Sequence, residues 1–283
     1  MNYILHNGTF LDSSLPSIYV SNRGFKYGDG FFESIRIIDG KPVFLENHYT
    51  RMVDGLKVYK IDKPVDFNLQ TLDYQLNQLI AKNNISDGGR ARITLTRKGE
   101  GFYAPDVNEL EYVMETHGKA DNKFTLNTSG LVVDLFPDIK KQVNKFSIFK
   151  TLNCQLYIHA SLFARERMID EALIQNEKMG IIESSTANLF LVSNGVLYTP
   201  GLVEGCVGGT MRMNVINLAI AHGIKVYECN LTPQNLLAAD EIFLTNAIAG
   251  IQWVGSYRTK RYFNNTAKKV LDLLNESVKE SVS

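Results

Sequence analysis

Four short segments of this chain gather residue types that could bind an anion, hold a proton or form a covalent bond. They are residues 23–34 (RGFKYGDGFFES), 48–51 (HYTR), 149–153 (FKTLN) and 183–190 (ESSTANLF). The first places three glycines within eight residues ahead of a predicted strand, which permits close approach of the backbone to another group. Each segment alone also has an ordinary explanation, because tight turns, solvated helical arginines and capping carboxylates are all common.

Lys150 is the residue in these segments that could form a covalent bond with a carbonyl group. It follows an apolar run, Phe146–Phe149, that we expect to be strand-like, and it opens a predicted helix, Leu152–Met168. A lysine at an apolar junction often extends its ammonium group to the surface. If Lys150 is buried instead, its pKa falls and its free amine can form a Schiff base. From these residues alone both interpretations stay open.

The elements that must position these segments fall into two groups, separated by a polar stretch at residues 118–122 (GKADN). We predict a smaller domain at residues 1–118, a linker at 119–123 and a larger domain at 124–283. In the first domain we expect strands Tyr3–His6 and Thr9–Leu11 around an Asn7-Gly8 turn, strand Phe31–Ile38, helices Glu46–Tyr59 and Phe67–Lys82, and strands Ala91–Thr96 and Glu111–Thr116.

The second group alternates strands with helices, so the predicted fold class is α/β, a mixed α+β arrangement. The expected strands are Glu171–Gln175, Asn188–Val192, Ile224–Cys229 and Glu241–Leu244. Besides Leu152–Met168 we expect a helix at Met211–His222, another starting at Thr232-Pro233, and a last one with Phe263, Ala267, Val270, Leu271 and Leu274 along one stripe.

Composition excludes several classes of function. Lys+Arg and Asp+Glu both number 30, so no broad electrostatic field favours a nucleic acid. The three cysteines are odd in number and far apart, and the five histidines show no pair at ligand spacing, so we expect neither a disulfide framework nor a metal site. The N-terminus has no signal-peptide pattern and no apolar run reaches membrane-spanning length, which favours a cytoplasmic protein without a membrane partner.

Together and in order, the segments resemble the motifs of the class IV aminotransferases, which are pyridoxal 5'-phosphate (PLP) enzymes of fold type IV. The resemblance extends from Asn7-Gly8 to Val254. Its matching motifs are Arg23–Glu33, His48–Arg51, Lys150–Asn153, Glu183–Phe190 with Ser185 as its central serine, Gly209–Arg212 and Asp240–Ala247. The resemblance implies two α/β domains with PLP at their interface, and a homodimer in which a loop of the partner helps to close the pocket.

The resemblance also implies a role for each motif. Lys150 would form the imine with PLP and move the substrate proton, and Glu183 would pair with the pyridine nitrogen. Arg51 and the backbone N–H groups of Gly209, Thr210 and Met211 would bind the phosphate, with Thr245, Asn246 and Ala247 as weaker candidates. The substrate pocket would include Tyr27, Phe32, Arg36, Arg92 and Arg97. A nucleotide-binding loop at 205–209 is disfavoured, because the Lys-Ser/Thr of a P-loop is missing.

The substrate, a small amino compound, depends on which branch of the family the chain resembles. D-Amino acid aminotransferases carry Tyr before the first-motif Glu and an Arg-x-His after the strand ending in Thr-Arg. Here those places hold Phe32 and residues 98–105 (KGEGFYAP). Phe32, Ile35 and Arg36 agree with branched-chain aminotransferases. Because strand residues alternate between faces, Arg92 and Arg97 point to opposite sides, and either could hold a substrate carboxylate.

The lyase branch of the family accounts best for the later motifs. Met211-Arg212 and Asn246-Ala247 resemble 4-amino-4-deoxychorismate lyases, although Glu33-Ser34 replaces the paired threonines of some lyases. We therefore expect such a lyase, releasing pyruvate to give 4-aminobenzoate for folate biosynthesis. A branched-chain-type aminotransferase is the alternative. A PLP-binding protein without turnover is a third possibility, but such a protein would be expected to lose Lys150, Glu183 or Arg51.

Overall fold

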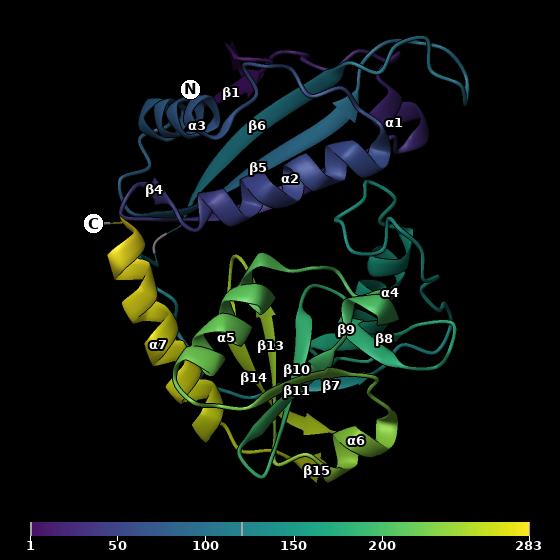
Figure 1. Ribbon diagram of the computed structural model, residues 1–283, viewed down its shortest axis with the longest axis vertical. Coiled ribbons are helices and arrows are strands. Elements are labelled where there is room, and N and C mark those ends of the chain that lie inside the picture. Colours follow the sequence, from purple (N-terminus) through teal and green to yellow (C-terminus); the bar gives the residue numbers. More distant parts are fainter. Residues whose placement is uncertain (1, 120, 283) are drawn as a thin grey trace. The chain divides into compact units, whose positions relative to one another are not determined.

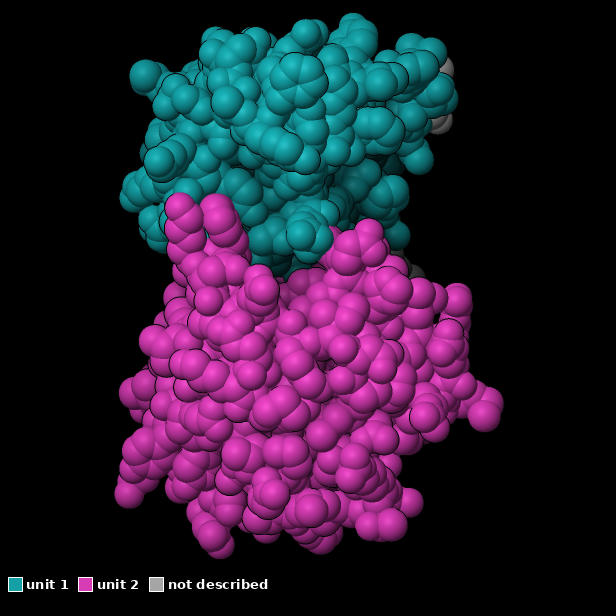
Figure 2. Space-filling model, turned by 90° about the vertical axis from the view of Figure 1, so that its right-hand side faces the viewer, with its two compact units in different colours: residues 1–123, 149–153, 278–283 teal, residues 124–148, 154–277 magenta. Residues whose placement is uncertain are grey.

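Two β-sheets, each with its own helices, make up the protein. The computed structural model describes residues 2–119 and 121–282 (Figure 1). The chain divides into two compact units, coloured separately in Figure 2. Unit 1 holds Met1–Lys123, Phe149–Asn153 and Val278–Ser283, and unit 2 holds Phe124–Ile148 and Cys154–Ser277. The short segment with Lys150 thus belongs to unit 1, whereas the sequence analysis placed it with residues 124–283.

Unit 1 is built on a six-stranded antiparallel sheet in the order β2-β1-β6-β5-β3-β4. The strands are β1 Tyr3–His6, β2 Thr9–Asp12, β3 Gly30–Ile38, β4 Lys41–Pro42, β5 Gly88–Arg97 and β6 Leu110–Lys119. Its helices are α1 Arg23–Tyr27, α2 Leu45–Tyr59 and α3 Leu69–Lys82. The predicted first hairpin is confirmed, because Asn7 and Gly8 both adopt positive φ, as its two-residue turn requires.

The two faces of this sheet differ in chemistry. On β3 and β5 alternate residues, such as Phe31, Ile35 and Ile93, are fully buried in an apolar core with Met52 and Leu56 of α2 and with residues of α3. The intervening positions form the other face and are mostly polar; they are Phe32, Ser34 and Arg36 on β3 and Arg90, Arg92 and Thr94 on β5. This second face is the one that carries chemistry-bearing side chains.

Unit 2 contains a nine-stranded sheet in the order β12-β11-β10-β13-β14-β7-β8-β9, with β15 paired to β14. A further pairing of β9 with β10 closes six of these strands into a ring. The strands are β7 Leu131–Leu135, β8 Glu171–Gln175, β9 Ile181–Ser184, β10 Asn188–Ser193, β11 Val196–Pro200, β12 Val226–Cys229, β13 Glu241–Asn246, β14 Gly250–Tyr257 and β15 Lys260–Arg261. The helices are α4 Gln155–Glu166, the 3-10 turn η1 Leu202–Glu204, α5 Thr210–Ala221, α6 Pro233–Ala238 and α7 Asn265–Val282.

Most predicted elements are confirmed to within a few residues, and the mixed α/β class is confirmed as well. Two predictions around Lys150 were wrong. Phe146–Phe149 forms a turn rather than a strand, and the following helix begins only at Gln155. Residues 150–152 are extended because their backbone pairs with β3. Phe263 was also misplaced on the last helical stripe, since it precedes α7 and is exposed.

Candidate active site

Lys150 lies on the polar face of the unit 1 sheet. The amide of Phe32 donates to the carbonyl of Lys150 at 2.8 Å, and the amide of Leu152 donates to that of Gly30 at 3.0 Å. This pairing sets Lys150 opposite Phe32, and its Nζ lies 5.0 Å from the centre of the Phe32 ring. A Cβ on Gly30 would lie 2.2 Å from the carbonyl oxygen of Leu95, so only glycine fits where the segment approaches β3.

Arg92 approaches the same aromatic ring. Its guanidinium carbon lies 3.7 Å from the centre of the Phe32 ring, a cation–π contact. The Nε of Arg92 donates weakly to Thr94 Oγ1 at 3.3 Å and lies 3.7 Å from a half-exposed carboxylate oxygen of Glu115. Phe32, Lys150 and Arg92 therefore bring an amine and an anion-binding group to one ring.

On the helix-covered face, Glu33 fixes two side chains of α2. Arg51 donates through Nε and Nη2 to the two carboxylate oxygens at 2.7 and 2.6 Å, and His48 Nδ1 lies 2.7 Å from Oε2. Burial raises the pKa of Glu33, but Arg51 and His48 together lower it more, to about 2. Burial lowers the pKa of His48, against the opposing effect of Glu33. Arg51 is thus held rigidly by an ionised carboxylate.

The guanidinium group of Arg97 donates hydrogen bonds to acceptors within unit 1. Its Nε donates to Asp29 at 2.9 Å, its Nη1 to the Lys60 carbonyl at 2.8 Å and to Asn108, and its Nη2 to the Tyr59 carbonyl at 2.7 Å. These acceptors tie the end of β5 to the end of α2. Since its donors are engaged and only 7% of the residue is exposed, Arg97 is poorly suited to hold a substrate carboxylate.

The other two predicted pocket residues of unit 1 differ in exposure. Tyr27 is partly exposed and stacks at a tilt on Tyr103, with ring centres 5.8 Å apart. Arg36 is almost completely buried, and its Nη2 donates to the backbone carbonyl of Asp121. Arg36 shares the face of Phe32 and Arg92, whereas Tyr27 lies on α1.

In unit 2, Glu183 on β9 is a buried carboxylate held from three sides. Lys141 Nζ and the Tyr157 hydroxyl donate to Oε1 at 2.7 and 2.8 Å, and the Val207 amide donates to Oε2 at 2.8 Å. A carboxylate offers about four acceptor positions, so one more donor can be accommodated. Burial, together with Glu183, raises the pKa of Tyr157 well above its ordinary value, which keeps this phenol protonated as a donor.

Asn188 joins Glu183 to the other predicted residues of this unit. It pairs with Glu183 on β9 and with Thr245 on β13, and its side-chain amide donates to the Val207 carbonyl at 2.8 Å. A Cβ on Gly209 would lie 2.0 Å from Asn188 Oδ1, so any other residue at this turn would displace the Asn188 side chain. The carboxylate, the turn and the end of β13 are therefore one connected assembly.

Helix α5 begins within this assembly. Its N-cap, Gly209, supplies no side-chain cap, and Thr210 and Met211 form its buried first turn. The first N–H groups of a helix have no partner inside the helix and favour a bound anion. Close by in the sheet, Thr245 Oγ1 is buried and has no hydrogen-bond partner among the described residues. The arrangement offers donors that an anionic group could satisfy.

Asn246 and Ala247, the two residues after Thr245, lie at the end of β13 and in the turn that follows it. Asn246 Oδ1 accepts from the amides of Ile248 and Ala249 at 3.0 and 2.8 Å, which closes the turn between β13 and β14. Ala247 lies in that turn and is partly exposed. Their contribution to an anion site would come through the backbone.

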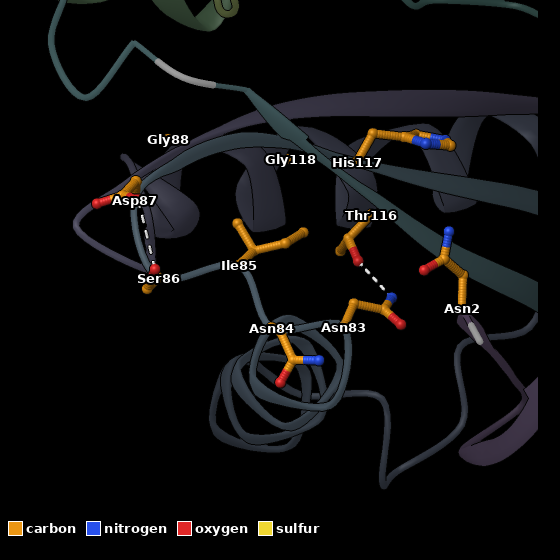
Figure 3. A pocket seen from close by; sticks show the side chains of 10 residues that line it. All are labelled: Asn2, Asn83, Asn84, Ile85, Ser86, Asp87, Gly88, Thr116, His117 and Gly118. Atoms are coloured by element: carbon orange, nitrogen blue, oxygen red, sulfur yellow. Dashed lines mark hydrogen bonds between the residues drawn. The ribbon is translucent and has the colours of Figure 1, made fainter.

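A separate pocket of about 430 Å³ lies at one end of the unit 1 sheet, and Figure 3 shows its lining. Its walls are polar, but Asn83 already donates to Thr116 Oγ1 at 2.7 Å and to the Tyr3 carbonyl at 2.9 Å. None of the predicted site residues lines it.

Among the residues that the structure describes, no cluster of His, Cys, Asp and Glu could hold a metal ion. No described helix is long and apolar enough to cross a membrane.

Comparison with known proteins decides the family. The family described as amino-transferase class IV matches residues 30–257. This chain belongs to the class IV aminotransferases. A relative in Methanocaldococcus jannaschii, provisionally named a branched-chain-amino-acid aminotransferase, is 31% identical over 284 residues, which covers 97% of this chain and 94% of that protein. Curated relatives named D-alanine aminotransferase include one in Bacillus licheniformis, 26% identical over 88% of this chain and 86% of that protein.

Solved structures agree with the family and its fold. A Legionella pneumophila protein provisionally named 4-amino-4-deoxychorismate lyase superimposes with a TM-score of 0.82 at 27% identity, covering 94% of this chain and 97% of that chain. A branched-chain amino acid aminotransferase from the organism abbreviated T.th., with pyridoxamine 5'-phosphate, superimposes with a TM-score of 0.87 at 22% identity, covering 98% and 94%. Class IV aminotransferases are PLP-dependent enzymes, and this chain is one of them.

The residues of this class IV aminotransferase fit the cofactor by their own chemistry. Glu183 has an acceptor position left that could receive a hydrogen bond from a protonated pyridine nitrogen. A phosphate could accept from the Thr245 hydroxyl, which has no partner among the described residues, and from the start of α5, which has no side-chain cap. The sequence motifs contained Asn188 but gave it no role. Lys141 and Tyr157 were missed entirely, because their contact with Glu183 joins positions 42 and 26 residues apart.

Proposed function

We propose that this class IV aminotransferase is a 4-amino-4-deoxychorismate lyase that uses Lys150 as its reactive amine. The observation that carries this proposal is the meeting of Lys150 and Arg92 at the Phe32 ring, where a substrate could present its amine-bearing carbon to Lys150 and a carboxylate to Arg92. The provisional name of the Legionella relative supports the lyase, as do Met211-Arg212 and Asn246-Ala247.

We assign the pyridine nitrogen and the phosphate of the cofactor to residues of unit 2. Glu183 would pair with the protonated pyridine nitrogen, and the amides of Thr210 and Met211 would bind the phosphate. The Gly209 amide, also expected there from the sequence, donates to the Val207 carbonyl at 2.8 Å. Thr245 would complete this anion site, and Arg51 is proposed as a further phosphate ligand. When bound, PLP supplies an electron sink that stabilises negative charge on the adjacent substrate carbon.

The chain's own groups then have defined tasks in the lyase reaction. Lys150 Nζ removes the proton from the carbon that carries the amine, and Arg92 holds a carboxylate so that this carbon faces the lysine. The bond to the enolpyruvyl oxygen on the neighbouring carbon breaks, and pyruvate and 4-aminobenzoate leave. Formation of the aromatic ring drives the step forward. Arg97 takes no part, because the fold uses its donors.

Direct product analysis tests the lyase. PLP-loaded protein supplied with 4-amino-4-deoxychorismate is expected to yield 4-aminobenzoate and pyruvate in equal amounts. Lys150→Ala should abolish both products and the visible absorption of covalently held cofactor, while far-UV circular dichroism stays unchanged. Glu183→Gln should keep the cofactor but slow the reaction by at least about 100-fold. Absence of 4-aminobenzoate from the wild-type protein would sink the lyase proposal.

A branched-chain-type aminotransferase is the second candidate, favoured by the 31% identity to the Methanocaldococcus protein. In that case L-leucine alone, without a keto acid, would convert the visible spectrum of the PLP form into that of the pyridoxamine phosphate form. An unchanged spectrum speaks against this candidate. A protein that takes up PLP, shows no spectral change with L-leucine and makes no 4-aminobenzoate would be a binding protein without turnover.

We further propose that the enzyme is a homodimer working in the cytoplasm. The apolar side chains of Tyr19, Val20, Phe25, Phe102 and Tyr103 of unit 1 are more than 70% exposed, which suits a surface buried in an assembly. The three cysteines are all unpaired, as in a reducing compartment. Sedimentation equilibrium should give twice the chain mass, and Phe102→Ser with Tyr103→Ser should shift it towards the monomer. Limited proteolysis is expected to cut first at residues 119–123.

A further inference from the structure

Three arginines share one face of the unit 1 sheet with Lys150. In the pairing of β3 with β5, Arg92 lies opposite Ser34 and Arg90 lies opposite Arg36. Since side chains alternate along a strand, these positions fall on the face of Phe32, and Lys150 lies opposite Phe32 on that face. The other face is filled by the apolar core with α2 and α3.

The pairing of Arg36 with Arg90 is unfavourable for the protein alone. Like charges directly opposite on neighbouring strands destabilise a sheet. Arg36 is 2% exposed, and burial lowers its pKa, with Asp121 opposing that effect. The Nε of Arg90 is buried and has no hydrogen-bond partner among the described residues. On the third strand, His117 and not a carboxylate stands opposite Arg90. The third strand therefore sets a carboxylate, that of Glu115 at 3.7 Å, opposite Arg92 but none opposite Arg90.

The guanidinium groups of Arg92 and Arg90 reach in the same direction along the face. Arg92 is opposite Ser34 but contacts the ring of Phe32, one step nearer to Lys150. Arg90 is opposite Arg36, but its Nη2 reaches Ser34 Oγ at 3.5 Å, again one step nearer. Successive positions on one face are roughly 6.5–7 Å apart. The face thus presents two anion-binding positions in line, starting beside Lys150.

We propose that the substrate carries two carboxylates, and that Arg92 binds the one nearer to Lys150 while Arg90 binds the farther one. This inference deepens the proposed function, on which it rests for the role of Lys150. A guanidinium can hold a carboxylate through two parallel hydrogen bonds. 4-Amino-4-deoxychorismate has a ring carboxylate and an enolpyruvyl carboxylate. A branched-chain amino acid would set an alkyl group against the buried Nε of Arg90 and offer it no acceptor.

Two ring compounds that differ by one carboxylate test the proposal without requiring turnover. Isothermal titration of the PLP-loaded protein with isophthalate and with benzoate is expected to show isophthalate binding at least about tenfold tighter. Arg90→Gln should weaken isophthalate by about 10- to 100-fold and change benzoate by less than about twofold. Lys98→Gln removes a charge from an exposed pair with Glu109 and should leave both affinities unchanged.

Equal affinity of the wild-type protein for the two probes would overturn the inference, and so would an unchanged affinity ratio in Arg90→Gln. If Arg90→Gln does not fold, Arg90→Lys keeps the charge but loses the planar pair of donors. It should reduce the ratio by at least about threefold, and an unchanged ratio again overturns the proposal. A wild-type protein that prefers isophthalate but makes no 4-aminobenzoate would refute only the lyase. Lyase turnover that survives Arg90→Gln unaltered would refute only the role of Arg90.

Discussion

Substitution of Glu33 by Gln should destabilise unit 1 by an amount that the pKa of this carboxyl sets. Glu33 accepts two hydrogen bonds from Arg51 and one from His48 in a fully buried position. Burial alone would raise its pKa, yet the charge of Arg51 and these hydrogen bonds lower it from 4.5 to about 2. At 1.36 kcal/mol per pKa unit, the ionised form contributes about 3 kcal/mol to the free energy of unfolding near neutral pH.

The sign of the pH dependence follows from the lowered pKa. Folding depresses the pKa of Glu33, so its contribution is complete above about pH 4.5 and is lost as the pH falls towards about 2. Urea unfolding, followed by circular dichroism, should therefore show Glu33→Gln less stable by about 3 kcal/mol at about pH 7. The difference should be clearly smaller at about pH 3, where the carboxyl of the unfolded chain is already protonated while that of the folded protein is still ionised.

A matched control separates this effect from general charge removal. Glu109→Gln breaks an exposed pair with Lys98 and should leave the free energy of unfolding almost unchanged at either pH. The free energy of unfolding of the wild type could differ from that of Glu33→Gln by the same amount at both pH values. In that case the interaction lost on substitution is not that of an ionised carboxylate. An ionised Glu33 would then not be the group that holds Arg51 rigid.

Three further substitutions test the other buried groups. Lys141→Met leaves the buried Glu183 without its cation and should lower the free energy of unfolding by about 3–5 kcal/mol in urea; a loss below about 1 kcal/mol would contradict the charge pairing. Arg97→Gln should lower stability by about 2 kcal/mol or more yet leave benzoate affinity unchanged in titration, and weaker benzoate binding would return Arg97 to the substrate pocket. Thr245→Val removes an orphaned hydroxyl, so cofactor-free protein should melt at the same or a higher temperature while PLP binds about 3- to 10-fold more weakly; unaltered PLP affinity would exclude Thr245 as a ligand.

Local signals in the sequence predicted most elements because their causes are local. The Asn7-Gly8 turn needs two residues that tolerate positive φ, and both adopt it. Thr232 and Pro233 start α6, with Asn235 completing the cap through its side chain. The stripe of Leu72, Leu76 and Leu79 places α3 against the core. In each case the deciding residues lie within a few positions of one another.

The segment around Lys150 was predicted less well because its conformation is decided by distant residues. Its apolar residues have the composition of a helix start, but the amide of Phe32 and the carbonyl of Gly30, more than a hundred positions earlier, pair with it and keep it extended. Gly30 permits this approach, since any Cβ would collide with β5. The glycine in the first motif is therefore required by its contact with the Leu95 carbonyl oxygen of β5. That relation is invisible to periodicity or turn chemistry.

The choice between Arg92 and Arg97 shows which part of a site sequence reasoning can reach. Alternation along a strand predicted that the two side chains face opposite sides, and the register of β5 with β3 agrees. Alternation could not tell which of the two arginines donates its hydrogen bonds to other parts of the protein. The hydrogen bonds decide it, because Arg97 donates to the carbonyls of Tyr59 and Lys60 at the end of α2. Arg92 instead makes a long hydrogen bond to Thr94 and a loose approach to the carboxylate of Glu115. An arginine whose strong acceptors belong to its own fold stabilises that fold. One whose neighbours are an aromatic ring and an amine retains the capacity to recognise a carboxylate that comes from outside.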